Sequence, residues 1–258
     1  TGRRAEDDWV KFVCPNQEKY RAERLDYIRN LINTCQPDGL SIDFIRYFVF
    51  WEKVYPDARP DPLQYACFCP TCLKKFQAES RLTIPHEWKS VSEQAEWILQ
   101  NHKPAWASWK CRTITSMVRE IATVARKSKP SIKLNLHLVP WRENDFNKGV
   151  RSIAGQDVAS LAPLVDFLSP MCYAHIVKQD PSWISSVVAY IARRGNKPVI
   201  PSVQVKEAYL AEKLTVGEFS RYLEEVRKPP SAGVIFWNWP MLVEDPEKAG
   251  LVASMKRP

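Results

Sequence analysis

The chain has 258 residues, of which 45% are hydrophobic and 26% charged, and its formal net charge is +8. This balance is typical of a globular protein and excludes disordered, coiled-coil and collagen-like chains. No apolar run approaches the roughly 18 residues of a membrane helix, so we expect no membrane span. The lysines and arginines are scattered, with no run longer than a pair, which favours a solvated surface over a nucleic-acid site.

Strands and helices are expected to alternate along one domain over residues 1–258. Six segments have the residue types of strands: 9–14, 38–47, 132–139, 165–173, 198–204 and 233–239. Helices are expected over 16–33, from Pro104, from Asp157, over 182–194 and 216–227, and near Pro246. Residues 52–103 are expected to form an irregular insertion. Strands that alternate with helices predict a parallel sheet.

Capping residues set the expected helix ends. Asn16 suits the N-cap of the first helix, and Pro104 suits the first turn of a long one. Gly195 is expected to close the helix over 182–194. Thr215 and Glu218 have the spacing of a capping box.

The strands alternate apolar and polar residues, which distinguishes between two architectures. Strands of an open, doubly wound sheet are covered on both faces and are apolar throughout. Here Leu134, Leu136 and Leu138 alternate with Asn135 and His137. One apolar face suits a ring of helices, and one polar face suits the interior of a (β/α)8 barrel. We therefore expect an α/β barrel, with six of its eight strands present.

Barrel active sites lie at the carboxyl ends of the strands. Those ends combine carboxylates, amides, a histidine and many aromatic residues: Cys14, 43–47, 137–141, 171–175, 204–207 and 237–239. They contain no Ser–His–Asp order and no H-E-x-x-H motif. Aromatic faces beside polar groups suit a sugar, whose C–H face packs on rings while its hydroxyls take polar partners.

Four segments carry a family resemblance. Residues 38–47, DGLSIDFIRY, resemble the D-G-[IL]-x-x-D-[FY]-I-R-Y strand of hypothetical glycoside hydrolase barrels of bacteria, which are related to α-amylase, α-galactosidase and chitinase barrels. Residues 67–72, CFCPTC, are similar to the C-x-C-x-x-C segment that follows it. Residues 166–173 and 233–239 look like the sixth and eighth strands.

This resemblance implies a glycosidase of carbohydrate metabolism that acts on a poly- or oligosaccharide and needs no cofactor for catalysis. It also implies that the first two βα units lie upstream of Thr1, and that the protein is secreted or periplasmic. The basic charge leaves open an acidic carbohydrate as substrate.

Asp43 is the first candidate for a catalytic residue because it lies at a strand end. A carboxylate there can act as nucleophile or stabilise an oxocarbenium-like transition state. The alternative is a structural ion pair with Arg46. Ser41 and Ile45 depart from the chitinase pattern D-G-x-D-x-D-x-E and argue against the substrate-assisted mechanism.

Glycoside hydrolysis needs a second carboxyl group. Glu143 follows the strand over 132–139, and Glu207 follows the strand over 198–204; these two are preferred. Asp145 follows the same strand as Glu143, and Glu52 and Asp180 lie in other loops. The residues expected to bind substrate are Arg46, Tyr47, His137, Trp141, Tyr173, Gln204, Trp237 and Asn238, with core packing as the alternative for the aromatic ones.

Cys67, Cys69 and Cys72 supply three close thiols. A structural zinc ion would need a fourth ligand, for which Cys14 and His86 are candidates. A disulfide and free packed thiols are the alternatives. Cys35, Cys111 and Cys172 are expected in the core.

Three other functions are alternatives. A non-catalytic carbohydrate-binding barrel is the main alternative to hydrolysis. A metal-dependent hydrolase would use Asp43, His137 and His175, and a nucleic-acid module would use the basic charge; with four histidines and scattered charge, both are disfavoured.

Overall fold

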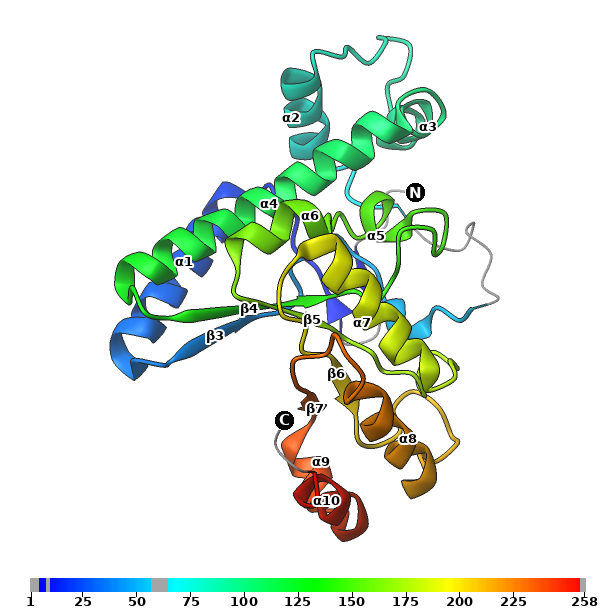
Figure 1. The fold of residues 1–258 in the computed structure, drawn as a ribbon. Coiled ribbons are helices and arrows are strands. Elements are labelled where there is room, and N and C mark those ends of the chain that lie inside the picture. Colours follow the sequence, from blue (N-terminus) through cyan, green and yellow to red (C-terminus); the bar gives the residue numbers. More distant parts are fainter. Residues whose placement is uncertain (1–4, 8–9, 57–64, 256–258) are drawn as a thin grey trace.

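The computed structural model describes residues 5–7, 10–56 and 65–255, and its centre is a series of parallel strands (Figure 1). Three strands form one sheet in the order β3 (Gly39–Ile42), β4 (Lys133–Leu138) and β5 (Phe167–Pro170). Two more, β6 (Ser202–Gln204) and β7 (Ile235–Trp237), form a parallel pair. Parallel bridges from Leu168 to Val199 and from Met171 to Ser202 join β5 to the β6 segment. The expected parallel α/β arrangement is confirmed.

Helices separate the strands. Between β3 and β4 lie η1 (Trp51–Lys53), α2 (Pro70–Ser80), α3 (Val91–Asn101) and α4 (Lys103–Ser128). The others are α1 (Glu18–Cys35), α5 (Gly149–Ser152), α6 (Val158–Leu161), η2 (Ala162–Leu164), α7 (Ser182–Gly195), α8 (Val216–Val226), α9 (Trp239–Val243) and α10 (Pro246–Ala253). Among the described residues, no helix has both the length and the apolar character needed to cross a bilayer.

The expected strand over residues 9–14 is wrong as a member of the parallel sheet. Residue 9 lies outside the described residues, and β2 (Val10–Lys11) pairs in antiparallel fashion with β1 (Glu6–Asp7). Phe12 instead packs its ring on Phe44 and Phe48, beyond the end of β3. The described part of the chain therefore has five parallel strands, not six.

Two helix ends differ from expectation. The N-cap of α1 is Gln17, and the amide of Asn16 instead donates to Tyr47 and Cys72. The left-handed residue after α7 is Asn196, at φ 48°, and Gly195 is still helical. Thr215 caps α8 by accepting from the amide of Glu218, but the expected capping box is only half formed, because the Glu218 carboxylate contacts His175 and Tyr222 instead.

The predicted irregular insertion is also wrong, because it contains two helices. Ser90 and Glu93 form a complete capping box at the start of α3, a pattern already present in the sequence. Phe76, Ile98, Trp106 and Trp109 form a second hydrophobic cluster between α2, α3 and the start of α4. Figure 1 shows these helices projecting from the body of the molecule.

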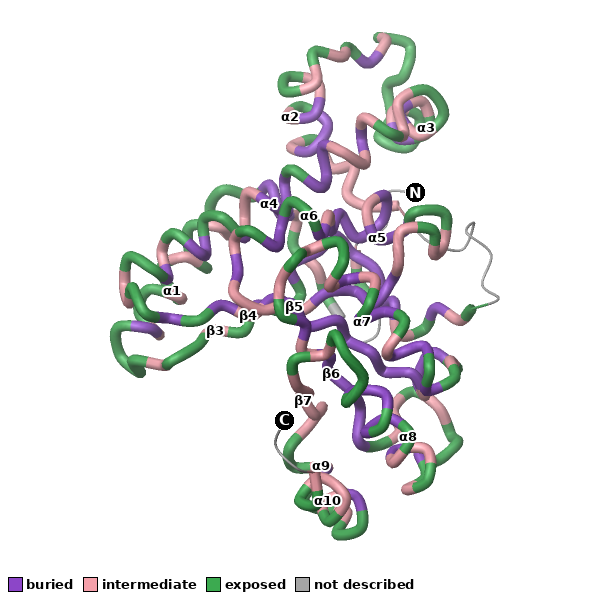
Figure 2. The backbone as a smooth tube through the Cα atoms, viewed as in Figure 1, coloured by how far each residue is buried: buried purple, intermediate pink, exposed green. Residues whose placement is uncertain are grey.

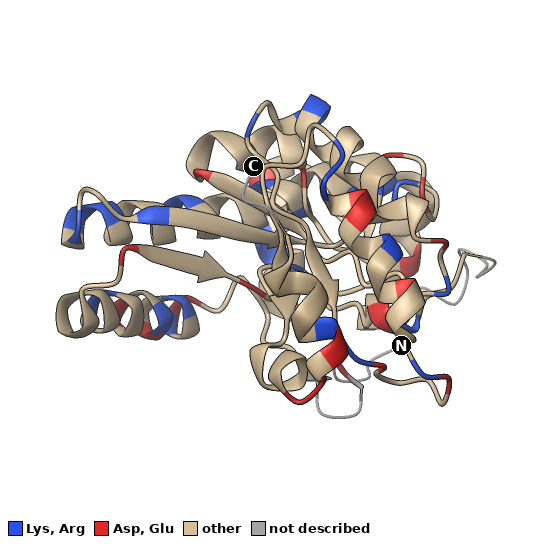
Figure 3. Ribbon diagram, turned by 60° about the horizontal axis from the view of Figure 1, so that its bottom comes forward, with Lys and Arg blue, Asp and Glu red and all other residues tan. Residues whose placement is uncertain are grey.

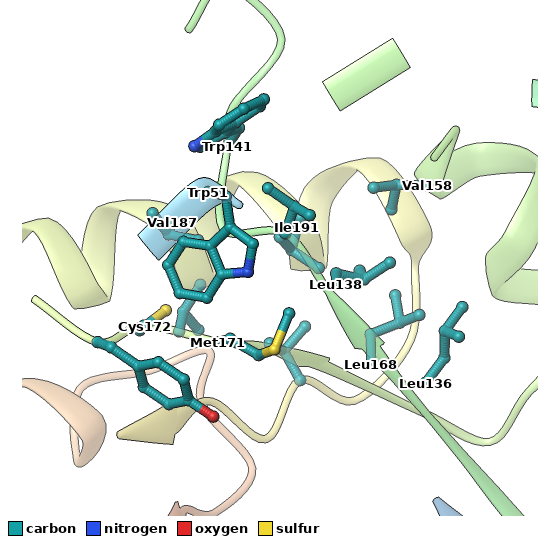
Figure 4. Close-up of a cluster of buried hydrophobic side chains, with 14 of the residues drawn as sticks. Trp51, Leu136, Leu138, Trp141, Val158, Leu168, Met171, Cys172, Val187 and Ile191 are labelled. Carbon is teal, nitrogen blue, oxygen red and sulfur yellow. The ribbon is translucent and has the colours of Figure 1, made fainter. Parts of the chain in front are cut away.

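The strands divide into an apolar and a polar face, as the alternation predicts. Leu134, Leu136 and Leu138 are fully buried. Figure 2 shows that the backbone at the centre of the molecule is buried, and Figure 4 shows Leu136, Leu138 and Leu168 in one cluster with Val158 and Ile191. On the other face, Asn135 donates to Ser41 and accepts from Ser169. Hydrogen bonds thus join three neighbouring strands across the polar face.

Both outer strands of the series have an open side. Among the described residues, β3 pairs only with β4, and β7 only with β6. A cavity of about 610 Å³ lies beside β3, lined by Tyr27, Ile28 and Leu31 of α1 and by Leu40 and Asp43. The apolar face of α1 is accordingly only partly covered.

Charged residues of both signs are spread over the helices in Figure 3.

Glycine at 195 is needed for packing, which gives a first prediction. A Cβ there would lie 2.6 Å from Leu168 Cδ1, so Gly195→Ala should destabilise the fold by ~1–3 kcal/mol through overpacking. Gly250, exposed in α10 with nothing within 4 Å of such a Cβ, is the matched control. Because alanine favours helix, Gly250→Ala should stabilise by ~0.5–1 kcal/mol. Urea unfolding measures both; equal effects of the two changes would contradict the packing argument.

Candidate functional site

Asp43 follows directly after β3, at the carboxyl end of the strand. Its side chain is exposed and lines the 610 Å³ cavity, while its Oδ1 accepts a hydrogen bond from the Phe44 amide at 2.6 Å. Phe44 has φ 55°, a left-handed conformation that costs a non-glycine residue free energy. The chain thus turns sharply at Asp43, and the next residues enter the core.

Arg46 is buried, with only 4% of the residue exposed. Its Cζ lies 4.6 Å from the centre of the Phe44 ring and 5.4 Å from that of Phe12. Burial lowers the pKa of Arg46, and the charges of Glu52 and Asp43 oppose that change. Among the described residues, no carboxylate forms an ion pair with Arg46 within 4.0 Å. A direct structural ion pair with Asp43 is therefore not formed.

Glu52 lies in η1, at the end of the buried segment that Arg46 begins. Burial raises the pKa of Glu52, and the Asp43 charge adds to the rise, while Arg46 opposes it. Its Oε2 is buried and has no hydrogen-bond partner among the described residues. Glu52 is thus a carboxyl group that is held in its protonated form more readily than an exposed glutamate.

His137 lies on the polar face of β4, in electrostatic contact with Asp43. Burial lowers the pKa of His137, whereas the Asp43 carboxylate raises it. Within the described chain, His137 Nδ1 and Arg46 Nε lack hydrogen-bond partners, as does Glu52 Oε2. Buried polar atoms are normally paired, so leaving these three atoms without a partner costs the fold free energy.

A column of aromatic rings stands beside these groups. Tyr173 stacks on Trp237, with 4.9 Å between the ring centres and 19° between the ring planes. The centre of the Trp51 ring lies 5.6 Å from that of Tyr173. Tyr173 is buried and shares a hydrogen bond with Ser202 at 3.3 Å. Burial raises the pKa of Tyr173, so its hydroxyl stays protonated. Trp237 is partly exposed, so the stacked pair reaches the surface.

The two preferred partners of Asp43 make other contacts. Glu143 Oε2 accepts a hydrogen bond from the Tyr190 hydroxyl at 3.1 Å and lies 3.9 Å from Arg194. Glu207 Oε2 accepts from the amide of Leu214 at 3.3 Å. Neither carboxylate affects the pKa of a residue around Asp43, so their catalytic roles remain predictions and Glu52 becomes the stronger candidate.

Several predicted substrate-binding residues support the structure from within. Tyr47 is buried, with Lys110 Nζ 4.4 Å from its ring centre. Gln204 is fully buried and binds the backbone of Ile176 and Lys206.

Trp141 and Asn238 contribute at two other points of the fold. Trp141 lies beside Trp51 in Figure 4 and lines a cavity of about 290 Å³ with it. Asn238 caps α9 through the amide of Met241. Both side chains thus help to hold loops that follow the strands.

The cysteines divide into two groups. Cys67, Cys69 and Cys72 lie together with Cys14, and all four sulfur atoms are within 4.8 Å of one another. His86, the other expected fourth ligand, is exposed and is not part of this group. Cys111 and Cys172 are buried as expected, but Cys35 is exposed at the end of α1, so its expected place in the core is wrong.

Sequence reasoning gave Glu52 too little weight. The signal was present in residues 47–52, YFVFWE, where a single carboxylate ends an apolar run. A carboxyl group carried into the core by such a run has a perturbed pKa, which is common at functional sites. His175 is not part of this group. Its two ring nitrogens are bound to the Glu218 carboxylate and to the backbone carbonyl of Glu212, so it does not lie with His137 as a pair of metal ligands.

Comparisons with known proteins identify the fold. No protein-family model and no curated protein sequence matches the chain. Among solved structures, it is similar to the PgaB (BpsB) glycoside hydrolase domain from Bordetella bronchiseptica, with 14% identity and a TM-score of 0.71 over 100% of this chain and 69% of that one. The chain has a glycoside-hydrolase-like fold.

Two further likenesses agree with this fold. A β-galactosidase from the haloarchaeon Halorubrum lacusprofundi has 12% identity and a TM-score of 0.62, covering 91% of this chain and 38% of that one. Bee venom hyaluronidase in complex with a hyaluronic acid tetramer has 13% identity and a TM-score of 0.51, covering 93% and 73%. At these identities the likeness concerns the fold and not the chemistry.

The electrostatic contact between Asp43 and His137 gives a second prediction. Since the Asp43 carboxylate raises the pKa of His137 against the effect of burial, Asp43→Asn should lower that pKa further. The chain has only 4 histidines, so their ring signals can be followed individually by NMR during a pH titration. His86, His102 and His175 are internal controls that should not move. An unchanged or raised His137 value would show that the two groups do not interact.

Proposed function

We propose that the protein is a glycoside hydrolase in which Asp43 and Glu52 act as the pair of carboxyl groups. One observation carries the proposal: the guanidinium of Arg46 is buried in electrostatic contact with both groups, yet it forms no ion pair with either. An arrangement that served only stability would pair these charges directly, because an unpaired buried charge is costly.

The two environments suit two roles. Glu52 has a raised pKa and acts as the acid, giving its proton to the glycosidic oxygen as the bond to the anomeric carbon breaks. Asp43, which is exposed, stabilises the positive charge that develops on the sugar. Water then adds to the anomeric carbon, and a carboxylate of the pair takes up its proton. Arg46 limits repulsion when both groups are ionised.

The neighbouring groups favour a carbohydrate as substrate. Trp237 and Tyr173 form a stacked pair beside the carboxylates, and such a face suits the C–H surface of a sugar ring. His137 Nδ1 and Arg46 Nε are buried polar atoms without partners in the described structure, and a local rearrangement on substrate binding would let sugar hydroxyls reach them. The similarity in fold to glycoside hydrolases supports the same class.

The proposal includes the barrel architecture. The strands follow one another in chain order from β3 to β7, whereas a doubly wound sheet reverses its order at a switch point. A ring of eight would need three further strands between β7 and β3, one more than the sequence indicated. Residues 52–103 would then be an insertion after the strand that carries Asp43.

Substitution of the two carboxyl groups tests the reaction. Asp43→Asn and Glu52→Gln should each lower the rate of sugar release by about 10²–10⁴-fold, while the melting temperature and glycan binding are kept. The wild type is first screened for released sugars against neutral and acidic polysaccharides. Glu143→Gln and Glu207→Gln are matched carboxylate variants, because their side chains bind groups elsewhere.

The outcomes separate the alternatives. Full activity of Asp43→Asn would refute the proposed centre, and a large loss in Glu143→Gln or Glu207→Gln with an active Glu52→Gln would transfer the acid role. Binding of glycans without any released sugar would replace hydrolysis by a carbohydrate-binding function.

A further inference from the structure

We propose that Cys14, Cys67, Cys69 and Cys72 bind one zinc ion through four thiolates. This metal centre is separate from the proposed chemistry: it lies with the N-terminal segment and α2, and not on the polar face of the strands. For Cys67, Cys69 and Cys72, the proposal thus favours a zinc ion over a disulfide and over free packed thiols.

The sulfur positions agree with tetrahedral coordination. Zinc–sulfur bonds of about 2.3 Å place the four sulfur atoms of a tetrahedral site about 3.8 Å apart. Here the Sγ atom of Cys14 lies 3.3 Å from that of Cys72 and 3.6 Å from that of Cys69, and all four sulfur atoms are within 4.8 Å of one another. A small inward adjustment around an ion would complete the site.

The four thiols converge from separate parts of the chain. Cys14 lies ahead of α1, Cys67 and Cys69 lead into α2, and Cys72 is in the first turn of that helix. Cys14 and Cys72 are 58 residues apart in sequence. Of the cysteines in the described chain, only these four lie together. Chance packing of small apolar residues would not gather four sulfur atoms at one point.

Asn16 supplies hydrogen-bond donors to two of the four sulfur atoms. Asn16 donates its backbone N–H to Cys14 Sγ at 3.4 Å and its side-chain amide to Cys72 Sγ at 3.3 Å. Hydrogen bonds of this kind orient and stabilise the ligands of a metal site. Cys69 and Cys72 also lie at the N-terminal end of the 11-residue α2, where the helix dipole favours negative charge.

Disulfides fit this arrangement less well. A disulfide needs two sulfur atoms about 2.05 Å apart, and it joins thiols in pairs. The described cysteines are free, and Cys14 is close to two others at once. A shared ion satisfies all four groups, whereas a single disulfide would leave two of them unpaired.

The site has a structural consequence. Asn16 also donates to the hydroxyl of Tyr47 at 3.5 Å, and Tyr47 follows Arg46 in the chain. A filled zinc site would hold the N-terminal segment against α2 and fix Asn16, which in turn contacts the segment that leads from Asp43 to Glu52. We therefore expect loss of the metal to lower thermal stability.

Metal analysis of protein purified without chelator or added metal tests the proposal. The wild type should contain about one equivalent of zinc, and Cys14→Ser should lose most of it. Cys35→Ser, which changes an exposed cysteine outside the site, and His86→Ala, which removes the other candidate ligand, should both retain it. Replacement by cobalt in the wild type should give the absorption bands of a four-thiolate site, a measurement that does not depend on any variant folding.

Several results would overturn the proposal. These are wild-type protein without metal, protein with iron in place of zinc, disulfides found by mass spectrometry of the unreduced protein, zinc retained by Cys14→Ser, or zinc lost from His86→Ala. Metal-free wild-type protein that still releases sugar would overturn this proposal alone, whereas zinc-loaded protein that releases no sugar would overturn the proposed function alone.

Discussion

The two-residue period of the parallel strands is the constraint on which the rest of the structure depends. It sends Leu134, Leu136 and Leu138 into the core under the helices, and it sends Asn135 and His137 to the opposite face. Because neighbouring strands are parallel and in register, polar side chains of different strands meet on that face. The carboxyl end of β3 thereby brings Asp43 within electrostatic reach of His137.

A buried cation lies in electrostatic contact with the candidate groups at this edge. The apolar segment that follows Asp43 carries Arg46 inside, and Arg46 takes aromatic rings rather than carboxylates as its direct contacts. Its charge still acts on Asp43 and Glu52, since field effects reach further than hydrogen bonds where water is excluded. The two carboxyl groups consequently differ in environment while they share one cation, which is the condition for an acid and a base in one site.

The sequence revealed what is periodic or local, and less of what depends on tertiary contacts. The strands β3 to β7 and the polar position of Asp43 follow from alternation, and the start of α8 follows from Thr215. The α2 and α3 helices were missed although Ser90 and Glu93 marked one of them. The candidate carboxyl groups could not be ranked from loop position alone, because burial of Glu52 depends on how residues 47–52 enter the core.

The same limit explains the cysteines. The C-x-C-x-x-C spacing indicated three ligands, but only the fold shows that the segment before α1 returns to α2 and supplies Cys14. Asn16, expected to cap α1, serves this contact instead, since its amide reaches both Cys72 and Tyr47. A residue that could stabilise one helix end thus joins the thiol cluster to the segment between Asp43 and Glu52. The position of the candidate catalytic segment therefore depends on the thiol cluster as well as on the strands.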